Sequence, residues 1–123
     1  MPKKILVVDD KANIVLSLEF LMNKAGYDVR TASDGEEALA AIAADPPDLI
    51  LLDVNMPTKN GFEVCEAIRA RNEWSHIRII MLTAHGRDIE REKGLALGAD
   101  DYLTKPFAIQ EVVSKVQELL EHS

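Results

Sequence analysis

The sequence LILLDVNMP, residues 49–57, gives the clearest indication of the fold. Its four large aliphatic residues are typical of a strand that is buried on both faces of a parallel sheet. The run ends abruptly at Asp53, and burying an unpaired carboxylate is costly. We therefore expect Asp53 to lie at the edge of the sheet, among partners that make its charge acceptable.

Short apolar runs alternate along the chain with segments that have helical spacing. The expected strands are residues 5–8, 28–32, 49–52, 77–82 and 101–103. The apolar residues that mark four helices are Ile14, Leu18, Leu21 and Ala25; Ala38, Leu39 and Ile42; Phe62, Cys65 and Ile68; and Ile109, Val112, Val113, Val116, Leu119 and Leu120. Residues 88–97 form a fifth, weaker candidate, because this segment is highly charged and contains Gly94.

This alternation predicts an α/β protein with a doubly wound, five-stranded parallel sheet and five helices. Right-handed crossovers leave few topologies, and the flavodoxin-like strand order 2-1-3-4-5 is the expected one. Its switch point lies between the first and third strands. Ligands of such sheets bind there, beyond the carboxyl ends of the strands.

Size and composition limit the function classes. The 123 residues, 47% of them hydrophobic, suit one domain spanning residues 1–123. A net charge of −7, from 21 acidic and 14 basic residues, argues against direct nucleic-acid binding. No apolar run approaches the ~20 residues of a membrane span, and no signal peptide is expected. The single cysteine cannot form an internal disulfide, so we expect a reducing, cytoplasmic location.

Polar side chains follow four of the predicted strands. Asp9 and Asp10 follow the first strand and Asp53 follows the third. Thr83 follows the fourth strand and Lys105 the fifth. Because parallel strands end at one edge of the sheet, these five side chains should converge.

Three neighbouring carboxylates cannot all ionise cheaply, because like charges raise each other's pKa. A hard divalent cation removes that conflict, and an all-oxygen cluster suits Mg²⁺, which Mn²⁺ could replace. With Lys105 and Thr83 beside it, Asp53 is equipped to attack a phosphoryl group and become an aspartyl phosphate. Each of these residues alone is more often structural, so the prediction depends on their convergence. His76 and His122 have no ligand-spaced partners, which argues against zinc.

Four motifs in order resemble the response-regulator receiver domains of two-component signalling. They are LVVDD (6–10), LDVNMP followed by Gly61, MLTA (81–84) and DDYLTKPF (100–107), and the match covers essentially the whole chain. The resemblance implies that Asp53 accepts a phosphoryl group from the phosphohistidine of a sensor histidine kinase or a phosphotransfer protein.

The resemblance also implies a ligand set for Mg²⁺. Asp10 and Asp53 would bind the ion directly, together with the backbone carbonyl of Asn55. Asp9 would act through water. The identities of Asn55 and His85 would tune the lifetime of the aspartyl phosphate.

A conformational switch is implied as well. Thr83 and Lys105 would hold the phosphoryl oxygens after moving toward Asp53, and Tyr102 would then turn inward. The signal would leave through the face made by the fourth helix, fifth strand and fifth helix. The Lys105–Pro106 peptide bond would be cis, which proline makes inexpensive.

Some residues depart from the usual pattern or are read as structural. Lys11 follows the aspartate pair, where it would either weaken metal binding or pair with Asp10. Residues 90–93 are read as a solvated helix face, and Trp74 as a hydrophobic cover near the end of the third helix.

Alternative functions stay open at this point. A Mg²⁺-dependent phosphatase with an aspartate nucleophile would need an acidic residue, as proton donor, at the position of Asn55. A nucleotide- or flavin-binding protein would need a glycine-rich loop after the first strand, but residues 9–13, DDKAN, contain no glycine. A degenerate receiver could act only as a docking module. The chain could be a stand-alone regulator or the receiver of a longer protein with an output domain, and a monomer or a phosphorylation-dependent dimer.

Overall fold

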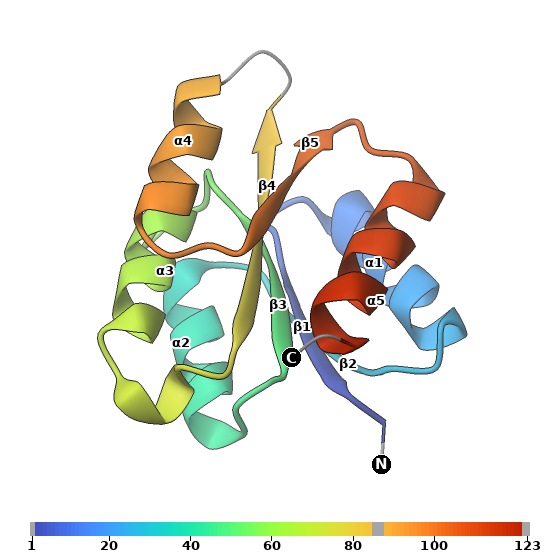
Figure 1. Ribbon diagram of the computed structural model, residues 1–123, viewed down its shortest axis with the longest axis horizontal. Coiled ribbons are helices and arrows are strands. Elements are labelled where there is room, and N and C mark those ends of the chain that lie inside the picture. Colours follow the sequence, from blue (N-terminus) through green and yellow to red (C-terminus); the bar gives the residue numbers. More distant parts are fainter. Residues whose placement is uncertain (1, 85–87, 122–123) are drawn as a thin grey trace.

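The computed structural model describes residues 2–84 and 88–121. Within them a sheet of five strands is covered by helices on both faces (Figure 1). The strands are β1 (Lys4–Val8), β2 (Asp28–Ala32), β3 (Leu49–Asp53), β4 (Arg78–Ala84) and β5 (Asp101–Lys105). The helices are α1 (Ala12–Lys24), α2 (Gly35–Ala44), α3 (Gly61–Arg69), α4 (Asp88–Ala96) and α5 (Ile109–Glu121), with a 3₁₀ turn η1 (Asn72–Trp74).

The strand order is β2-β1-β3-β4-β5 and every pair is parallel, which confirms the predicted flavodoxin-like topology. Val8 at the end of β1 lies opposite Leu52 of β3, and Asp53 lies opposite Leu82 of β4. The residues that follow β1 and β3 therefore meet at the same edge. β5 extends to Lys105, two residues beyond the predicted strand.

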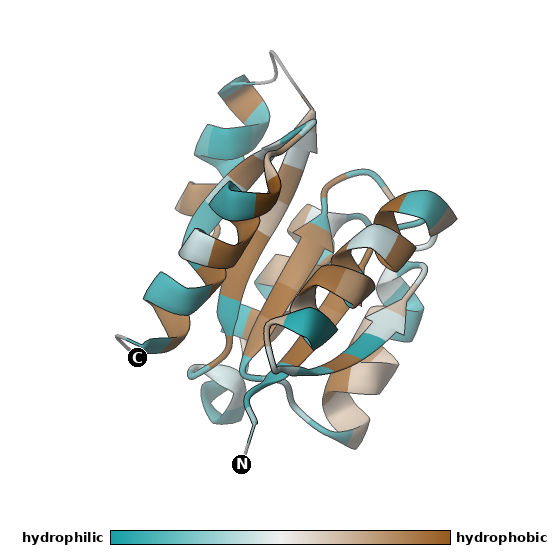
Figure 2. Cartoon of the chain, turned by 90° about the vertical axis from the view of Figure 1, so that its right-hand side faces the viewer, coloured by the Kyte–Doolittle hydropathy of each residue, from teal (hydrophilic) through white to brown (hydrophobic). Residues whose placement is uncertain are grey.

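Two hydrophobic layers hold the helices on the sheet. Successive strand residues point to opposite faces, so Leu6 packs in the layer with α2 and α3 while Ile5 packs in the layer with α1 and α5. Every residue of β3 is buried, as its aliphatic run predicted. Figure 2 shows this hydrophobic sheet between the more polar helices. Trp74 closes the first layer just after α3 and is 7% exposed, which confirms its role as a cover.

Helix α4 is more buried on its inward-facing side than its sequence indicated. Glu90 is buried, so the prediction of a solvated face over residues 90–93 is wrong there. Glu90 and Gly94 are four residues apart and share the side of α4 that packs inward. At Gly94 a β-carbon would lie 3.0 Å from Cγ of Met81, so a small residue lets α4 approach β4 closely.

No helix among the described residues has the length and apolar character needed to cross a membrane.

Candidate functional site

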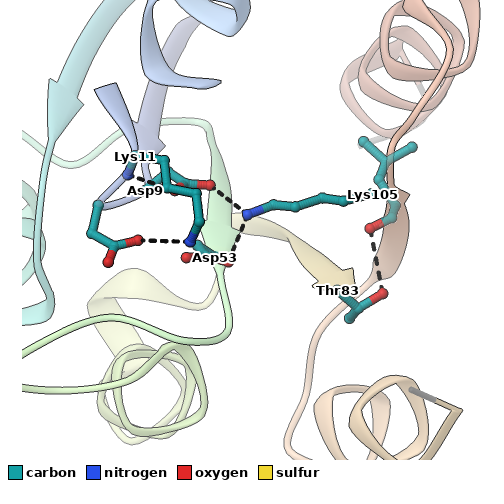
Figure 3. Close-up of polar contacts among 7 residues, drawn as sticks. Asp9, Lys11, Asp53, Thr83 and Lys105 are labelled. Carbon is teal, nitrogen blue, oxygen red and sulfur yellow. Dashed lines mark hydrogen bonds and ion pairs between the residues drawn. The ribbon is translucent and has the colours of Figure 1, made fainter. Parts of the chain in front are cut away.

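At the carboxyl ends of β1, β3 and β5, two carboxylates and one ammonium group are in contact (Figure 3). Nζ of Lys105 lies 2.8 Å from Oδ2 of Asp9 and 3.0 Å from Oδ1 of Asp53. Asp9 is fully buried and Asp53 is 4% exposed. The ammonium group therefore links the carboxylates of β1 and β3 in a place that water hardly reaches.

Burial shifts the charge balance of this group. It raises the pKa of the Asp53 carboxyl, which the hydrogen bond from Lys105 opposes and the nearby charge of Asp9 reinforces, so that the pKa lies above its ordinary value. Burial alone would lower the pKa of the Lys105 ammonium, but its hydrogen bonds to Asp9 and Asp53 leave it raised. Lys105 is thus held as a cation, while the positive charge near Asp53 does not fully offset the effect of burial on its pKa.

Asp9, Asp10 and Asp53 each offer a carboxylate oxygen within 4.8 Å of the others. Oδ2 of Asp53 is buried and has no hydrogen-bond partner among the residues that the structure describes. A buried carboxylate oxygen without a partner is costly unless something binds to it. An all-oxygen donor set with an unpartnered oxygen fits a hard cation such as Mg²⁺.

Lys11 contributes to the geometry of the acidic cluster. Its backbone N–H donates to Oδ1 of Asp9 at 2.9 Å, which fixes that carboxylate with its other oxygen toward Lys105. Its Nζ lies 3.5 Å from Oδ1 of Asp10. Of the two expectations for Lys11, the structure shows the pairing with Asp10, which is weak because both groups are exposed to water.

Thr83 stands apart from the charged group. Its side chain is buried and its hydroxyl donates to the carbonyl of Leu103 at 3.4 Å. Figure 3 shows the Thr83 side chain away from Asp9 and Asp53. The structure thus brings Asp9, Asp53 and Lys105 together but not the Thr83 hydroxyl. The expectation that Lys105 would have to move toward Asp53 is wrong, since the two already touch.

Tyr102 is half-buried and lies between two cationic side chains. The Arg91 guanidinium of α4 and the Lys115 ammonium of α5 are each 5.1 Å from its ring centre. Lys115 also donates to Oδ1 of Asp101 and to the carbonyl of Tyr102, both at 3.0 Å. Sequence reasoning missed both cations, because no motif or spacing marks them.

Two further predictions concern the segments that follow β3 and β5. Asn55 is exposed on the β3–α3 loop, two residues beyond Asp53. The Lys105–Pro106 peptide bond, expected to be cis, is cis. His85 lies outside the described residues.

A groove of about 820 Å³ runs from the charged group along α1 to the β5–α5 turn. Asp53 and Lys105 lie at one end of it. Phe20 and Ile109 line it and are 69% and 67% exposed. Sequence reasoning missed this surface, although exposed large hydrophobic side chains on a helix are a signal for it.

The fold and this cluster define the class of protein. Residues 5–117 match the family model of the response regulator receiver domain, and the chain belongs to that family, which serves two-component signalling.

Known proteins agree with this assignment. The chain is 49% identical over 123 residues to the alkaline phosphatase synthesis transcriptional regulatory protein PhoP of Bacillus subtilis (strain 168). The match covers 100% of this chain but only 50% of that protein. A putative response regulator from Chloroflexus aurantiacus J-10-fl superposes with a TM-score of 0.95 at 39% identity, covering 98% of this chain and 99% of that one. The chemotaxis response regulator CheY4 of Vibrio cholerae gives 0.90 at 36% identity, covering 97% and 99%.

Proposed function

We propose that residues 1–123 form a receiver domain that takes a phosphoryl group onto Asp53 from the phosphohistidine of a sensor histidine kinase or a phosphotransfer protein. One observation carries the proposal. Oδ2 of Asp53 is buried without a hydrogen-bond partner among the described residues, at the edge of the sheet and beside the Lys105 ammonium. A carboxylate placed in this way can serve as a nucleophile and as a metal ligand.

The residues present fit Mg²⁺, and Mn²⁺ could replace it. Asp10, Asp53 and the backbone carbonyl of Asn55 would hold the ion, with Asp9 acting through water. When bound, the ion supplies positive charge that lowers repulsion between the carboxylates and the incoming phosphoryl oxygens.

The chain's own residues carry out a single phosphoryl transfer. A carboxylate oxygen of Asp53 attacks phosphorus, the P–N bond of the donor breaks, and the imidazole leaves with the bonding electron pair and takes up a proton. Lys105 is already beside Asp53 and needs only to turn toward a phosphoryl oxygen. Thr83 must exchange the Leu103 carbonyl for another phosphoryl oxygen, and this exchange is the step that a switch can use.

Tyr102 is the aromatic residue that would respond to that movement. It lies in β5, beside Thr83's strand, and Met81 of β4 is its partner in the sheet. Arg91 and Lys115 contact its ring from α4 and α5. A change at Tyr102 would therefore reach α4, β5 and α5 together, which supports that face as the output surface.

The partner that brings the phosphoryl group would occupy the groove beside Asp53. Phe20 and Ile109 offer apolar contacts there, while Lys11 and Lys24 add positive charge. A helix carrying the phosphohistidine fits a groove of this kind, because apolar anchors on one face of a helix lie in such surfaces.

Output and location complete the proposal. The chain spans half of the Bacillus subtilis relative, a transcriptional regulatory protein, so the signal would pass to a separate protein or to an output domain. Direct nucleic-acid binding, membrane insertion and substrate turnover are not part of the proposed role, and the domain would be monomeric or dimerise on phosphorylation. The free, buried thiol of Cys65 supports a reducing, cytoplasmic location.

Phosphorylation with a small donor tests this function. With Mg²⁺ and acetyl phosphate, the protein should gain one phosphoryl group by intact mass, and Asp53→Asn should gain none. Asp45→Asn, which changes a half-buried carboxylate paired with Lys4 at the start of β1, should behave like the wild type. Continuous hydrolysis of phosphate esters would favour the phosphatase alternative, and no incorporation at all would favour a docking module.

A further inference from the structure

The β3–α3 loop, which carries Asn55, is fastened to the start of α2. The hydroxyl of Thr58 accepts a hydrogen bond from the backbone N–H of Glu36 at 3.1 Å and lies 3.4 Å from Oδ1 of Asp34. Next to it, the N–H of Gly35 donates to the carbonyl of Pro57 at 3.4 Å. These contacts join segments more than twenty residues apart.

Thr58 adopts an unusual backbone conformation to make them. Its φ is +65°, the left-handed region, which β-branched residues rarely enter because it is strained for them. Strained backbone persists where surrounding contacts impose it. Thr58 is exposed, so core packing does not impose this conformation, and the hydroxyl contacts with α2 are what the structure offers instead.

The start of α2 also packs tightly against the loop, at Gly35. At Gly35 a β-carbon would lie 2.1 Å from the carbonyl oxygen of Lys59 and 2.5 Å from its Cβ. Any side chain at Gly35 must push the loop away. The start of α2 and the loop are therefore matched in shape as well as in hydrogen bonding.

The base of the loop is fixed independently. The N–H of Val54 donates to the carbonyl of Leu82 at 3.2 Å, and its own carbonyl accepts from Gly61 at 2.8 Å. Asn55 lies between this anchor and the Thr58 contact. The backbone on both sides of Asn55 is therefore held by hydrogen bonds.

We propose that Thr58 is a positioning residue, whose hydroxyl fastens the β3–α3 loop to α2 and so aims the Asn55 carbonyl at the metal site. This inference rests on the proposed function, because it gives that carbonyl its metal-binding role. Residues that orient ligands in this way change metal affinity without touching the ion. The proposal also makes α2, which contributes no ligand, part of the device that sets Mg²⁺ affinity.

Three substitutions separate positioning from general stability. Thr58→Val keeps the shape and the backbone strain but removes the hydroxyl. Thr58→Gly removes the hydroxyl and relieves the strain, so it should fold at least as stably. Thr58→Ser keeps the hydroxyl.

Calorimetric titration with Mg²⁺ gives the affinity of each variant, and urea unfolding in EDTA gives its stability. Thr58→Val and Thr58→Gly should both bind Mg²⁺ about threefold to tenfold more weakly than the wild type, the effect of losing one orienting hydrogen bond. Thr58→Ser should restore the affinity. The amide resonance of Met56, which shares a peptide bond with the Asn55 carbonyl, should shift with Mg²⁺ in the wild type and less in the two hydroxyl-free variants.

The outcomes separate the two proposals. Wild-type affinity in both hydroxyl-free variants would overturn the positioning role and leave the proposed function intact. Affinity that follows stability, with Thr58→Gly unimpaired and Thr58→Val weakened, would also overturn it. A wild-type protein that binds no Mg²⁺ would refute the proposed function and this inference together.

Discussion

Replacing Asp53 by asparagine should stabilise the metal-free protein, although it removes the residue on which the proposed function depends. The buried Asp53 carboxylate lies in a cluster with buried Asp9 and exposed Asp10, in which carboxylate oxygens are within 4.8 Å of one another. At an effective dielectric constant of ~20, two unit charges at that distance repel by roughly 3–4 kcal/mol. The Lys105 ammonium offsets much of this repulsion, since it contacts Asp9 and Asp53 together.

What Lys105 does not offset is the burial of Oδ2. An unpartnered buried polar atom costs about 1–3 kcal/mol, and more when it is charged. Asparagine keeps a polar atom at this place but removes the charge whose burial raises the pKa of the Asp53 carboxyl. We therefore expect Asp53→Asn to raise the free energy of unfolding in EDTA by about 1–3 kcal/mol. In a chain of this size that corresponds to a rise in Tm of about 3–6 °C for each kcal/mol.

Urea unfolding at pH 7 in EDTA, followed by the fluorescence of the buried Trp74, measures this difference. Adding Mg²⁺ should stabilise the wild type by mass action and stabilise Asp53→Asn much less. An Asp53→Asn protein that is less stable than the wild type in EDTA, or equally stabilised by Mg²⁺, would show that the Asp53 charge does not destabilise the metal-free protein.

Asp45 provides the matched control. Its hydrogen bond with Lys4 lowers the pKa of the Asp45 carboxyl below the ordinary value of about 4. A group with a lowered folded-state pKa contributes stability above its unfolded pKa, and that stability is lost as the pH falls through the folded pKa. Asp45→Asn should therefore lower stability slightly at pH 7, the opposite of Asp53→Asn, and the difference should vanish in acid.

Other predictions follow from the same contacts. Lys105→Met leaves the buried carboxylates of Asp9 and Asp53 uncompensated, so the metal-free protein should lose about 3–5 kcal/mol of stability, and saturating Mg²⁺ should restore part of it; unchanged urea midpoints would contradict this. Burial raises the pKa of the Cys65 thiol to about 11, so alkylation at pH 8 should be slow in the folded protein and fast in denaturant, and fast labelling of the native state would be the contrary result. Phe20→Ala should slow phosphotransfer from a partner kinase at least fivefold while leaving labelling by acetyl phosphate unchanged, and equal loss with both donors would show that Phe20 is not a docking residue.

The sequence predicted the strands and the charged edge because local patterns determine them. The aliphatic run of β3 can only be buried on both faces, and parallel strands must end on one side. Asp9, Asp53 and Lys105 therefore had to lie close together, as the structure shows.

What the sequence could not show are contacts that depend on side-chain placement in three dimensions. Thr58 meets α2 through a strained backbone that no pattern marks. Arg91 and Lys115 reach Tyr102 from two different helices. Glu90 looked like a surface residue because its neighbours are charged, but the close approach of α4 to β4 buries it.

The central claim is that Asp53 is the residue that receives the phosphoryl group. Peptide mapping by mass spectrometry after brief reaction with acetyl phosphate and Mg²⁺ tests it most directly. We expect the added mass on the peptide containing residues 49–57, at Asp53, and no added mass when the reaction is run in EDTA. Finding the group on Asp9, Asp10 or any residue outside that peptide would contradict it.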